Sequence, residues 1–205
     1  MNTVELQGRI HNIYEGRFIT IVTLIVNGTT NKGETVNFPQ VKFTGQSRED
    51  VKNFKIGDYV NISGTMKVRS VTQKNGHNYF DQFIKGQMIY AAQTDMSDKF
   101  NQSLGGQYNN INEVLIKGEI KSTNTDHGLI SVMIVPDDEK FRLWMTTYIH
   151  DKDSFLKKYI PGTRVCVKAE IQTTRREKNG EVRFFENLII KYLDIDNEPV
   201  ANTVK

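Results

Sequence analysis

Apolar and polar residues alternate along most of this chain, and the alternation returns in a second copy. Residues 4–14 read VELQGRIHNIY and residues 114–124 read VLIKGEIKSTN, each with alternating apolar side chains around a glycine, Gly8 or Gly118. A period of two residues is typical of a β-strand with one buried face. The pattern therefore predicts two copies of one structural unit, which start about 110 residues apart.

Two further alternating runs follow in each copy, and each predicts a strand. In the first copy they are RFITIVTLIV (17–26) and TVNFPQVKFTG (35–45). In the second copy they are GLISVMIV (128–135) and KFRLWMTTYIH (140–150). Pro39 interrupts the third run of the first copy, and a bulge there would keep the Lys42 side chain out of the core.

After the third run, the spacing of apolar residues changes to that of a short helix. The segments are SREDVKNFKIGD (47–58) and KDSFLKKYIPGT (152–163), and Gly57 and Gly162 suit the helix exits. The residues expected on the buried faces of these helices are Val51 and Phe54, matched by Leu156 and Tyr159.

Two more alternating runs complete each copy, with an Asn-Gly pair between them that is typical of a hairpin turn. They cover 59–70 and 78–90 in the first copy, and 164–176 and 183–195 in the second. An offset of 105 residues places Phe80, Phe83 and Ile84 on Phe185, Leu188 and Ile189. Of each adjacent pair, Tyr79 with Phe80 and Phe184 with Phe185, one ring is expected in the core.

Five strands with one helix between the third and fourth form the pattern of the OB fold, a small Greek-key barrel. We therefore predict an all-β chain, with one short helix per domain, made of two tandem OB-fold five-stranded barrels. The predicted boundaries are 1–92 for the first OB-fold domain, 93–112 for a polar flexible linker, 113–197 for the second OB-fold domain and 198–205 for the C-terminal tail.

Composition excludes several classes of function. The chain has 205 residues, 38% hydrophobic and 25% charged, with a net charge of +3 that is too small to indicate a binding partner by itself. A single cysteine, Cys166, permits neither an intramolecular disulfide nor a cysteine-based zinc site. No phosphate-binding loop, nucleophile elbow or metal-ligand spacing occurs, so we predict no enzyme activity, no cofactor and no metal.

The acidic turn Asp137–Glu139 is interpreted as a solubility feature. The polar start and the lack of any ~20-residue apolar run predict a cytoplasmic protein with no membrane partner.

The run NFKIGDYVNISGTMKVRS…QKNGHNYF (53–80) resembles the bacterial and phage single-stranded DNA-binding protein (SSB) family. The resemblance lies in the turn that ends the helix, the fourth strand, the basic hairpin arm and the aromatic-rich fifth strand. Phe43 stands where that family has an aromatic residue at the end of strand three. Residues 157–187 keep the same layout with weaker identity, so the resemblance extends over about 180 residues.

The resemblance implies sequence-independent binding and protection of single-stranded DNA in replication, recombination or repair, in a phage or plasmid of a bacterial host. That family has one OB domain per chain and four per assembly, so two per chain imply a homodimer with four OB domains. The acidic C-terminal tail of the family is absent, and recruitment of partners through such a tail is not expected. The aromatic residue of the family's arm is also missing, with Val71 and Arg176 or Glu177 in its neighbourhood.

A general binder of single strands needs cations for phosphates and aromatic faces for bases. In KFRLWMTTY (140–148), strand parity places Phe141, Leu143 and Met145 on the core side. The opposite side would carry Arg142, Trp144, Thr146 and Tyr148, a row suited to stacking and phosphate contact. The alternative is that Trp144 packs beneath the linker or against a partner domain.

Further candidate binding residues lie in three places. The arm cations between strands four and five are Lys67, Arg69 and Lys74 in the first copy and Arg175, Arg176, Lys178 and Arg183 in the second. Strand three of the first copy contributes Lys42 and Phe43, whose ring is expected to face either the core or the groove. The turn between strands one and two contributes Tyr14, Arg17 and Phe18.

Two alternatives to DNA binding stay open. An OB-fold groove also accepts RNA, and nothing in the sequence selects for or against a 2′-hydroxyl. The barrels could instead be the scaffold of a protein–protein or inhibitory module.

Overall fold

The alternating runs form strands in the computed structural model of the chain. It describes residues 1–30, 33–72, 76, 78–92, 111–126, 128–137, 139–149, 151–178 and 181–196. Most of the predicted linker and the whole predicted tail lie outside the described residues, and so does Lys74.

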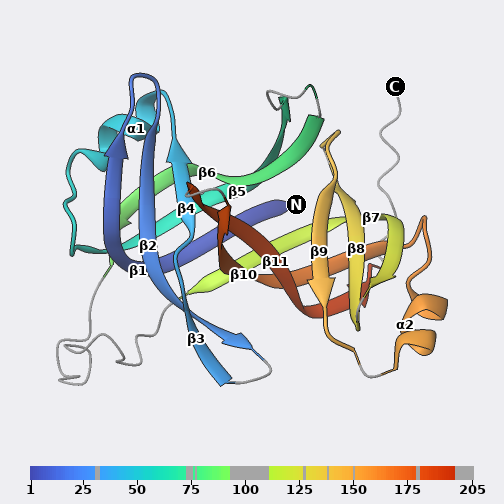
Figure 1. Ribbon diagram of the computed structural model, residues 1–205. Helices are drawn as coiled ribbons and strands as arrows, with labels where there is room; N and C mark the ends of the chain where they lie inside the picture. The colour runs from blue at the N-terminus through green and yellow to red at the C-terminus, as the bar shows by residue number, and fades with distance from the viewer. Residues whose placement is uncertain are drawn as a thin grey trace.

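The first half of the chain forms a closed barrel of five strands (Figure 1). Strand β1 pairs with β5 and with β2, β5 pairs with β6, β6 pairs in parallel with β4, and β4 pairs with β2. Strand β3 pairs with β2 outside this ring. The elements are β1 (Asn2–Glu15), β2 (Thr20–Thr30), β3 (Gly33–Asn37), β4 (Gln40–Phe43), α1 (Gln46–Val51), β5 (Tyr59–Thr72) and β6 (Asn78–Ala91).

The second half repeats the order of pairing. Strand β7 pairs with β10 and with β8, β10 pairs with β11, β11 pairs in parallel with β9, and β9 pairs with β8. The elements are β7 (Asn112–Asp126), β8 (Leu129–Pro136), β9 (Leu143–Thr147), α2 (Lys152–Lys158), β10 (Arg164–Lys178) and β11 (Glu181–Ile195). The prediction of an all-β chain with an OB-type barrel, and a helix between its third and fourth strands, is confirmed.

The repeated glycine of the first strand has a steric role in both halves. A Cβ atom on Gly8 would lie 2.3 Å from the carbonyl oxygen of Ile25, and one on Gly118 would lie 2.3 Å from that of Val135. At these points β1 and β7 each pair with strands on both sides. Glycine therefore allows the backbones to approach closely enough for the barrel to close.

The helices end earlier than the sequence predicts, α1 at Val51 and α2 at Lys158, so Gly57 and Gly162 lie in the turns that follow. One buried face also differs. Gly57 and Gly162 have φ of +96° and +90°, conformations that favour glycine. In α2 the buried residues are Phe155 and Tyr159, whose ring centroids are 4.6 Å apart, and Leu156 is only partly buried. The expected partner of Tyr159 was therefore wrong by one position, because a spacing of four residues, rather than three, faces the barrel here.

The fifth strands match at an offset of 104 residues, and the expected offset of 105 was wrong. Val41 pairs with Ile84 in the first half, and Met145 pairs with Leu188 in the second. All four side chains are buried. Leu188 is thus the counterpart of Ile84 and not of Phe83. A slip of one residue exchanges the two faces of a strand, so this correction decides which arm residues correspond.

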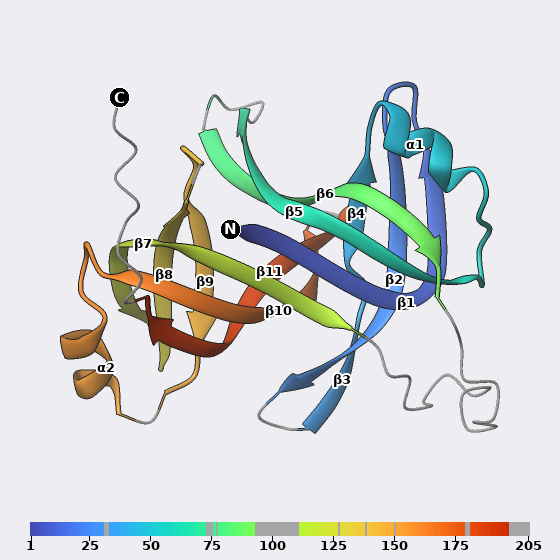
Figure 2. The same cartoon turned by 180° about the vertical axis from the view of Figure 1, so that it is seen from behind.

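The two halves join through a short antiparallel seam between β1 and β7. Val4 pairs with Val114 at its centre, Asn2 pairs with Ile116, and Leu6 pairs with Asn112. Because Val4 and Val114 are counterparts, each half offers the same strand segment to the other, as in a symmetric dimer interface. Seen from behind, β6, β5, β1, β7, β10 and β11 form one continuous sheet (Figure 2).

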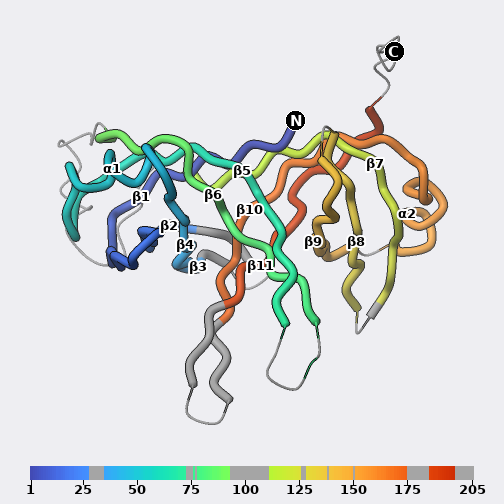
Figure 3. The backbone as a smooth tube through the Cα atoms, turned by 90° about the horizontal axis from the view of Figure 1, so that it is seen from above, coloured from blue at the N-terminus to red at the C-terminus, as the bar shows by residue number. Residues whose placement is uncertain are grey.

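The β5–β6 hairpin extends beyond the first barrel as an arm (Figure 3), and the ladder of β10 with β11 continues to the pair Lys178–Glu181. Pairing of β5 with β1 ends at Gly64, and β5 then continues with β6 alone. We define the β5–β6 arm as residues 67–72 and 78–83, and the β10–β11 arm as residues 172–178 and 181–187. In the first arm Phe80 is 72% exposed and Tyr79 is partly buried. Neither ring is in the core, because this arm has left the barrel.

Candidate nucleic-acid interface

Strand β9 presents the predicted row of polar and aromatic side chains. Leu143 and Met145 are buried, whereas Trp144 is 44% exposed and Tyr148, just beyond the strand, is 51% exposed. Arg142, just before the strand, is exposed, and it makes no ion pair with any residue that the structure describes. Thr146, between the two rings, is partly buried. The row therefore offers two aromatic surfaces and an exposed cation on one edge of the second half of the chain.

The β5–β6 arm lies against β9 and supports this row. The amide Oε1 of Gln82 accepts a 2.5 Å hydrogen bond from the backbone N–H of Trp144, and its Nε2 donates to the Trp144 carbonyl at 3.1 Å. These contacts hold the main chain of Trp144 and leave its indole exposed. The alternative that Trp144 is buried beneath the linker or another domain is not what the described residues show.

Lys67, one of the predicted arm cations, is engaged in a contact between the two halves. Its Nζ lies 2.5 Å from Glu139 Oε1 and 5.3 Å from the centroid of the Phe141 ring. Asp137 similarly accepts a 2.8 Å hydrogen bond from Arg164. The acidic turn interpreted as a solubility feature therefore also holds structural ion pairs.

Strand β4 is the counterpart of β9, but its exposed row is occupied by charge pairs. Lys42 lies outside the core, but the predicted bulge near Pro39 was wrong, because Asn37 pairs with Val26 and Gln40 with Thr23 in one unbroken register. Strict alternation therefore turns Lys42 outward, and its Nζ is 3.8 Å from Asp81 and 4.4 Å from the Phe83 ring centroid. Burial lowers the pKa of Lys42, and the nearby Arg69 lowers it further. Arg69 itself lies 2.7 Å from Asp81. These two predicted phosphate contacts thus already share one carboxylate.

Phe43 faces the core and not the groove. Its ring is fully buried, and a Cβ atom on Gly86 would lie 2.4 Å from it. A ring enclosed in this way has no free face for a base. Phe43 therefore does not belong to the interface, and its place in the family resemblance is explained by packing.

The loop between β1 and β2 forms a separate exposed site. Tyr14 is 58% exposed and Phe18 is 74% exposed, and the Arg17 guanidinium lies 4.9 Å from the Phe18 ring centroid. Arg48 of α1 donates to the Arg17 carbonyl at 2.8 Å and to the Thr20 hydroxyl at 3.0 Å, which ties the loop to the helix. The three predicted residues of this loop are together, but they lie in the other half of the chain from Trp144.

The β10–β11 arm contains four of the predicted cations, and the structure describes their backbones only. In its ladder Arg175 pairs with Phe184, Arg176 with Arg183, and Lys178 with Glu181. Their roles stay predictions. Phe80 and Phe185, which is 40% exposed, are arm aromatics that the sequence analysis did not select. The signal that could have found them is the length of the paired runs, since strands of 14 and 15 residues exceed what a small barrel needs.

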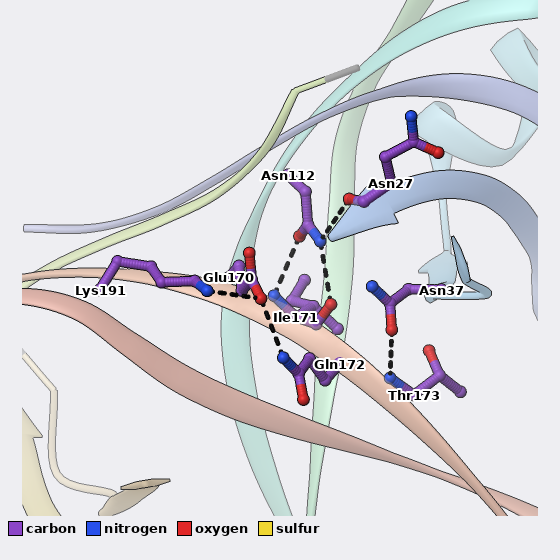
Figure 4. Close-up of polar contacts among 8 residues, drawn as sticks. All are labelled: Asn27, Asn37, Asn112, Glu170, Ile171, Gln172, Thr173 and Lys191. Carbon is purple, nitrogen blue, oxygen red and sulfur yellow. Dashed lines mark hydrogen bonds and ion pairs between the residues drawn. The ribbon is translucent and has the colours of Figure 1, made fainter. Parts of the chain in front are cut away.

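Polar side chains at the centre of the molecule fix the halves in register (Figure 4). Asn112 of β7 exchanges two 2.9 Å hydrogen bonds with the backbone of Ile171, and its Nδ2 also donates to the Asn27 carbonyl at 3.3 Å. Asn37 accepts a 3.0 Å hydrogen bond from the backbone N–H of Thr173, whose hydroxyl accepts from the backbone N–H of Phe38 at 3.0 Å. The β10–β11 arm is therefore anchored to the first barrel at its base.

A groove of about 490 Å³ continues from the β9 row along the second half of the chain. Tyr148 lines it together with Tyr159 and Tyr192, and Tyr192 is 58% exposed. The hydroxyl of Tyr159 donates to the Leu193 carbonyl at 2.8 Å, which holds its ring in the wall. The groove offers aromatic walls next to Tyr148 and so extends the β9 row.

Within the described residues, no group of three or more His, Cys, Asp or Glu is placed to hold a metal ion. No described helix has the length and apolar character needed to cross a lipid bilayer.

Comparison with known proteins shows the fold. No protein-family model and no curated protein sequence matches the chain. Among solved structures, the wild-type single-stranded DNA binding protein from Thermus aquaticus is 13% identical, and the match covers 100% of this chain and 97% of that one with a TM-score of 0.68. A deletion mutant of that protein is 15% identical, with 100% and 98% coverage and a TM-score of 0.65. The chain therefore has an SSB-like OB fold along its whole length.

Proposed function

We propose that this protein binds single-stranded DNA without sequence preference, through two tandem OB-fold domains, and that it is not an enzyme. The observation that carries the proposal is the β9 row, where the rings of Trp144 and Tyr148 and the cation of Arg142 are exposed together. Stacking on aromatic rings accepts any base and contributes about 1–3 kcal/mol per base, while cations follow the phosphates. The whole-chain likeness to an SSB fold supports the same function.

The two domains contribute unequally in this proposal. The position of Trp144 on β9 is occupied on β4 by Gln40, and Lys42 next to it is paired with Asp81. The β9 row and the adjoining groove therefore form the main stacking surface. Tyr14, Arg17 and Phe18 form a secondary DNA contact on the first domain. The cations of the β10–β11 arm contact the phosphate backbone of the DNA.

We further propose that two copies associate, so that four OB domains act together, and that the protein serves DNA replication, recombination or repair in a bacterial cell or its phage. Protein mass in solution, measured by light scattering, tests the association. A mass of about twice the 23.6 kDa chain is expected, and a monomer at micromolar concentration contradicts it.

The function is tested by fluorescence-anisotropy titrations with labelled oligo-dT, oligo-U and duplex DNA of equal length. We expect tight binding of oligo-dT that weakens as salt is raised, with a slope of log K against log salt of roughly −0.7 for each phosphate contacted. Duplex is expected to bind weakly. A clear preference for oligo-U would assign the protein to RNA, and no response to any of the three would leave the barrels as a protein-interaction scaffold.

A further inference from the structure

Two side chains at equivalent positions hold the arms on the opposite barrels. Gln82 and Glu186 each stand two residues before the buried residue, Ile84 or Leu188, that pairs with the third strand. Their partners Trp144 and Gln40 are also counterparts, each one residue before Met145 or Val41. The halves are thus fastened to each other by a matched pair of contacts between an arm and an edge strand.

Gln82 satisfies both backbone groups of its partner. Its amide accepts from the Trp144 N–H and donates to the Trp144 carbonyl. A primary amide can do both because it carries an acceptor oxygen and a donor NH₂ group.

Glu186 makes the matching contact with a carboxyl group. Its Oε1 accepts a 2.6 Å hydrogen bond from the backbone N–H of Gln40. An ionised carboxylate can only accept, so it has nothing to offer the neighbouring carbonyl. A protonated carboxylic acid has one O–H donor and one acceptor, which reproduces the hydrogen-bonding pattern of the Gln82 amide.

The surroundings of Glu186 favour its uncharged form. Its charged neighbours are Lys42 on β4 and Asp81 on β6. Lys42 is itself 3.8 Å from Asp81, and Arg69 of β5 also pairs with Asp81, so neither cation is dedicated to Glu186. Among the described residues no cation lies within ion-pair distance of the Glu186 carboxyl. Glu186 is partly buried, and removal from water raises its pKa to about 7. The hydrogen bond from the Gln40 N–H and the charge of Lys42 act in the opposite direction, and the nearby Asp81 adds to the rise.

We propose that Glu186 fastens the β10–β11 arm to β4 as a neutral carboxylic acid, in the manner of the Gln82 amide on β9, and that loss of its proton loosens this arm alone. Of the two contacts between an arm and the opposite half, the Gln82 contact then does not titrate, whereas the Glu186 contact responds to pH. The inference goes beyond DNA binding and needs no nucleic acid for its test.

The direction of the pH effect follows from which state holds the proton. In the unfolded chain Glu186 ionises near its ordinary pKa of 4.5, whereas in the folded chain it keeps its proton up to about pH 7. The folded state therefore binds more protons between these values, and the stability that Glu186 contributes falls as pH rises through this window. Well above pH 7, where folded and unfolded chains have both lost this proton, the contribution no longer changes with pH.

The experiment compares the thermal unfolding midpoint of the full chain at pH 5.5 and pH 8.5 for the wild type and two variants. Glu186→Gln replaces the acid by the amide found at the equivalent position, and Gln82→Glu makes the reverse change on the other arm. We expect Glu186→Gln to raise Tm by several degrees at pH 8.5 and to change it little at pH 5.5. Gln82→Glu is expected to lower Tm at pH 8.5 more than at pH 5.5.

The Glu186 carboxyl carbon, followed by NMR with Glu186→Gln used for assignment, reports the proton directly. A midpoint well above 5 is expected. A midpoint near 4.5 would overturn the proposal, and so would a Glu186→Gln variant that is destabilised equally at both pH values, since the carboxylate would then be the required form.

Discussion

Trp144 combines an exposed indole with a backbone that is fixed on both sides of the residue. Met145 is buried, and the N–H and carbonyl of Trp144 are both bonded to Gln82. A stacking residue is most effective when its position is fixed before the base arrives, because less conformational freedom is lost on binding. The environment of Trp144 therefore suits a platform for bases.

Substituting Trp144 by alanine should weaken binding and leave stability unchanged. Loss of one base stack costs about 1–3 kcal/mol, which corresponds to roughly 5- to 150-fold in the Kd for oligo-dT. Anisotropy titration measures the Kd, and thermal unfolding checks the fold. Tyr90→Ala is the matched control, because Tyr90 is 50% exposed on β6 in the continuous sheet away from β9. An equal loss of affinity for oligo-dT in the two variants would show that Trp144 is not part of the interface.

Sequence parity identified the outward face of β9 correctly, because a strand that begins and ends in a barrel must alternate. Sequence parity could not decide whether the Phe43 ring faces the core or the groove, or which carboxylates pair with Lys42 and Lys67. Those depend on Gly86, Asp81 and Glu139, which approach only after the strands have closed and the arms have crossed. Long-range pairing of charges is not encoded in local spacing.

At the scale of elements, the two arms add to the connection between the halves. Each arm continues a barrel hairpin past the last barrel pairing and contacts the third strand of the opposite half, through Gln82 on β9 and Glu186 on β4. The repeat of the sequence predicted the hairpins, but their contact with the opposite half appears only in three dimensions. The two arms therefore contact the strands of the candidate interface and also connect the two halves.

Removing the amide of Gln82 should loosen the β5–β6 arm from β9. In Gln82→Leu the backbone groups of Trp144 lose two exposed hydrogen bonds, each worth about 0.5–1.5 kcal/mol. We expect faster hydrogen exchange of the Trp144 amide and a lower unfolding midpoint. Gln87→Leu, at an exposed position of the same strand, serves as the control. Unchanged exchange at Trp144 would show that the arm is held in another way.

At the scale of the whole molecule, the β1–β7 seam, the Asn112 bridge and the arm contacts make the halves interdependent. Asn112 of the second half bonds to Asn27 of the first, and Thr173 bonds to Asn37 and Phe38. The predicted picture of two barrels on a flexible linker omitted these contacts, because nothing in the repeat indicates that β1 and β7 pair. These hydrogen bonds between the halves favour cooperative folding of the two.

We therefore expect the chain to unfold in one cooperative transition. Differential scanning calorimetry should give a calorimetric enthalpy equal to the van't Hoff enthalpy for the full chain, as for a two-state unit. Two resolved transitions, or a van't Hoff enthalpy near half the calorimetric value, would mean that the halves fold independently.

The central claim is that the β9 row is the surface on which single-stranded DNA stacks, and the fluorescence of Trp144 tests it most directly. Trp144 is the single tryptophan of the chain, so the signal has one source. Titration with oligo-dT should quench the emission in a saturable way, and added salt should restore it as the phosphates are released. Full binding by anisotropy with no change in Trp144 emission would place the DNA elsewhere and contradict the account.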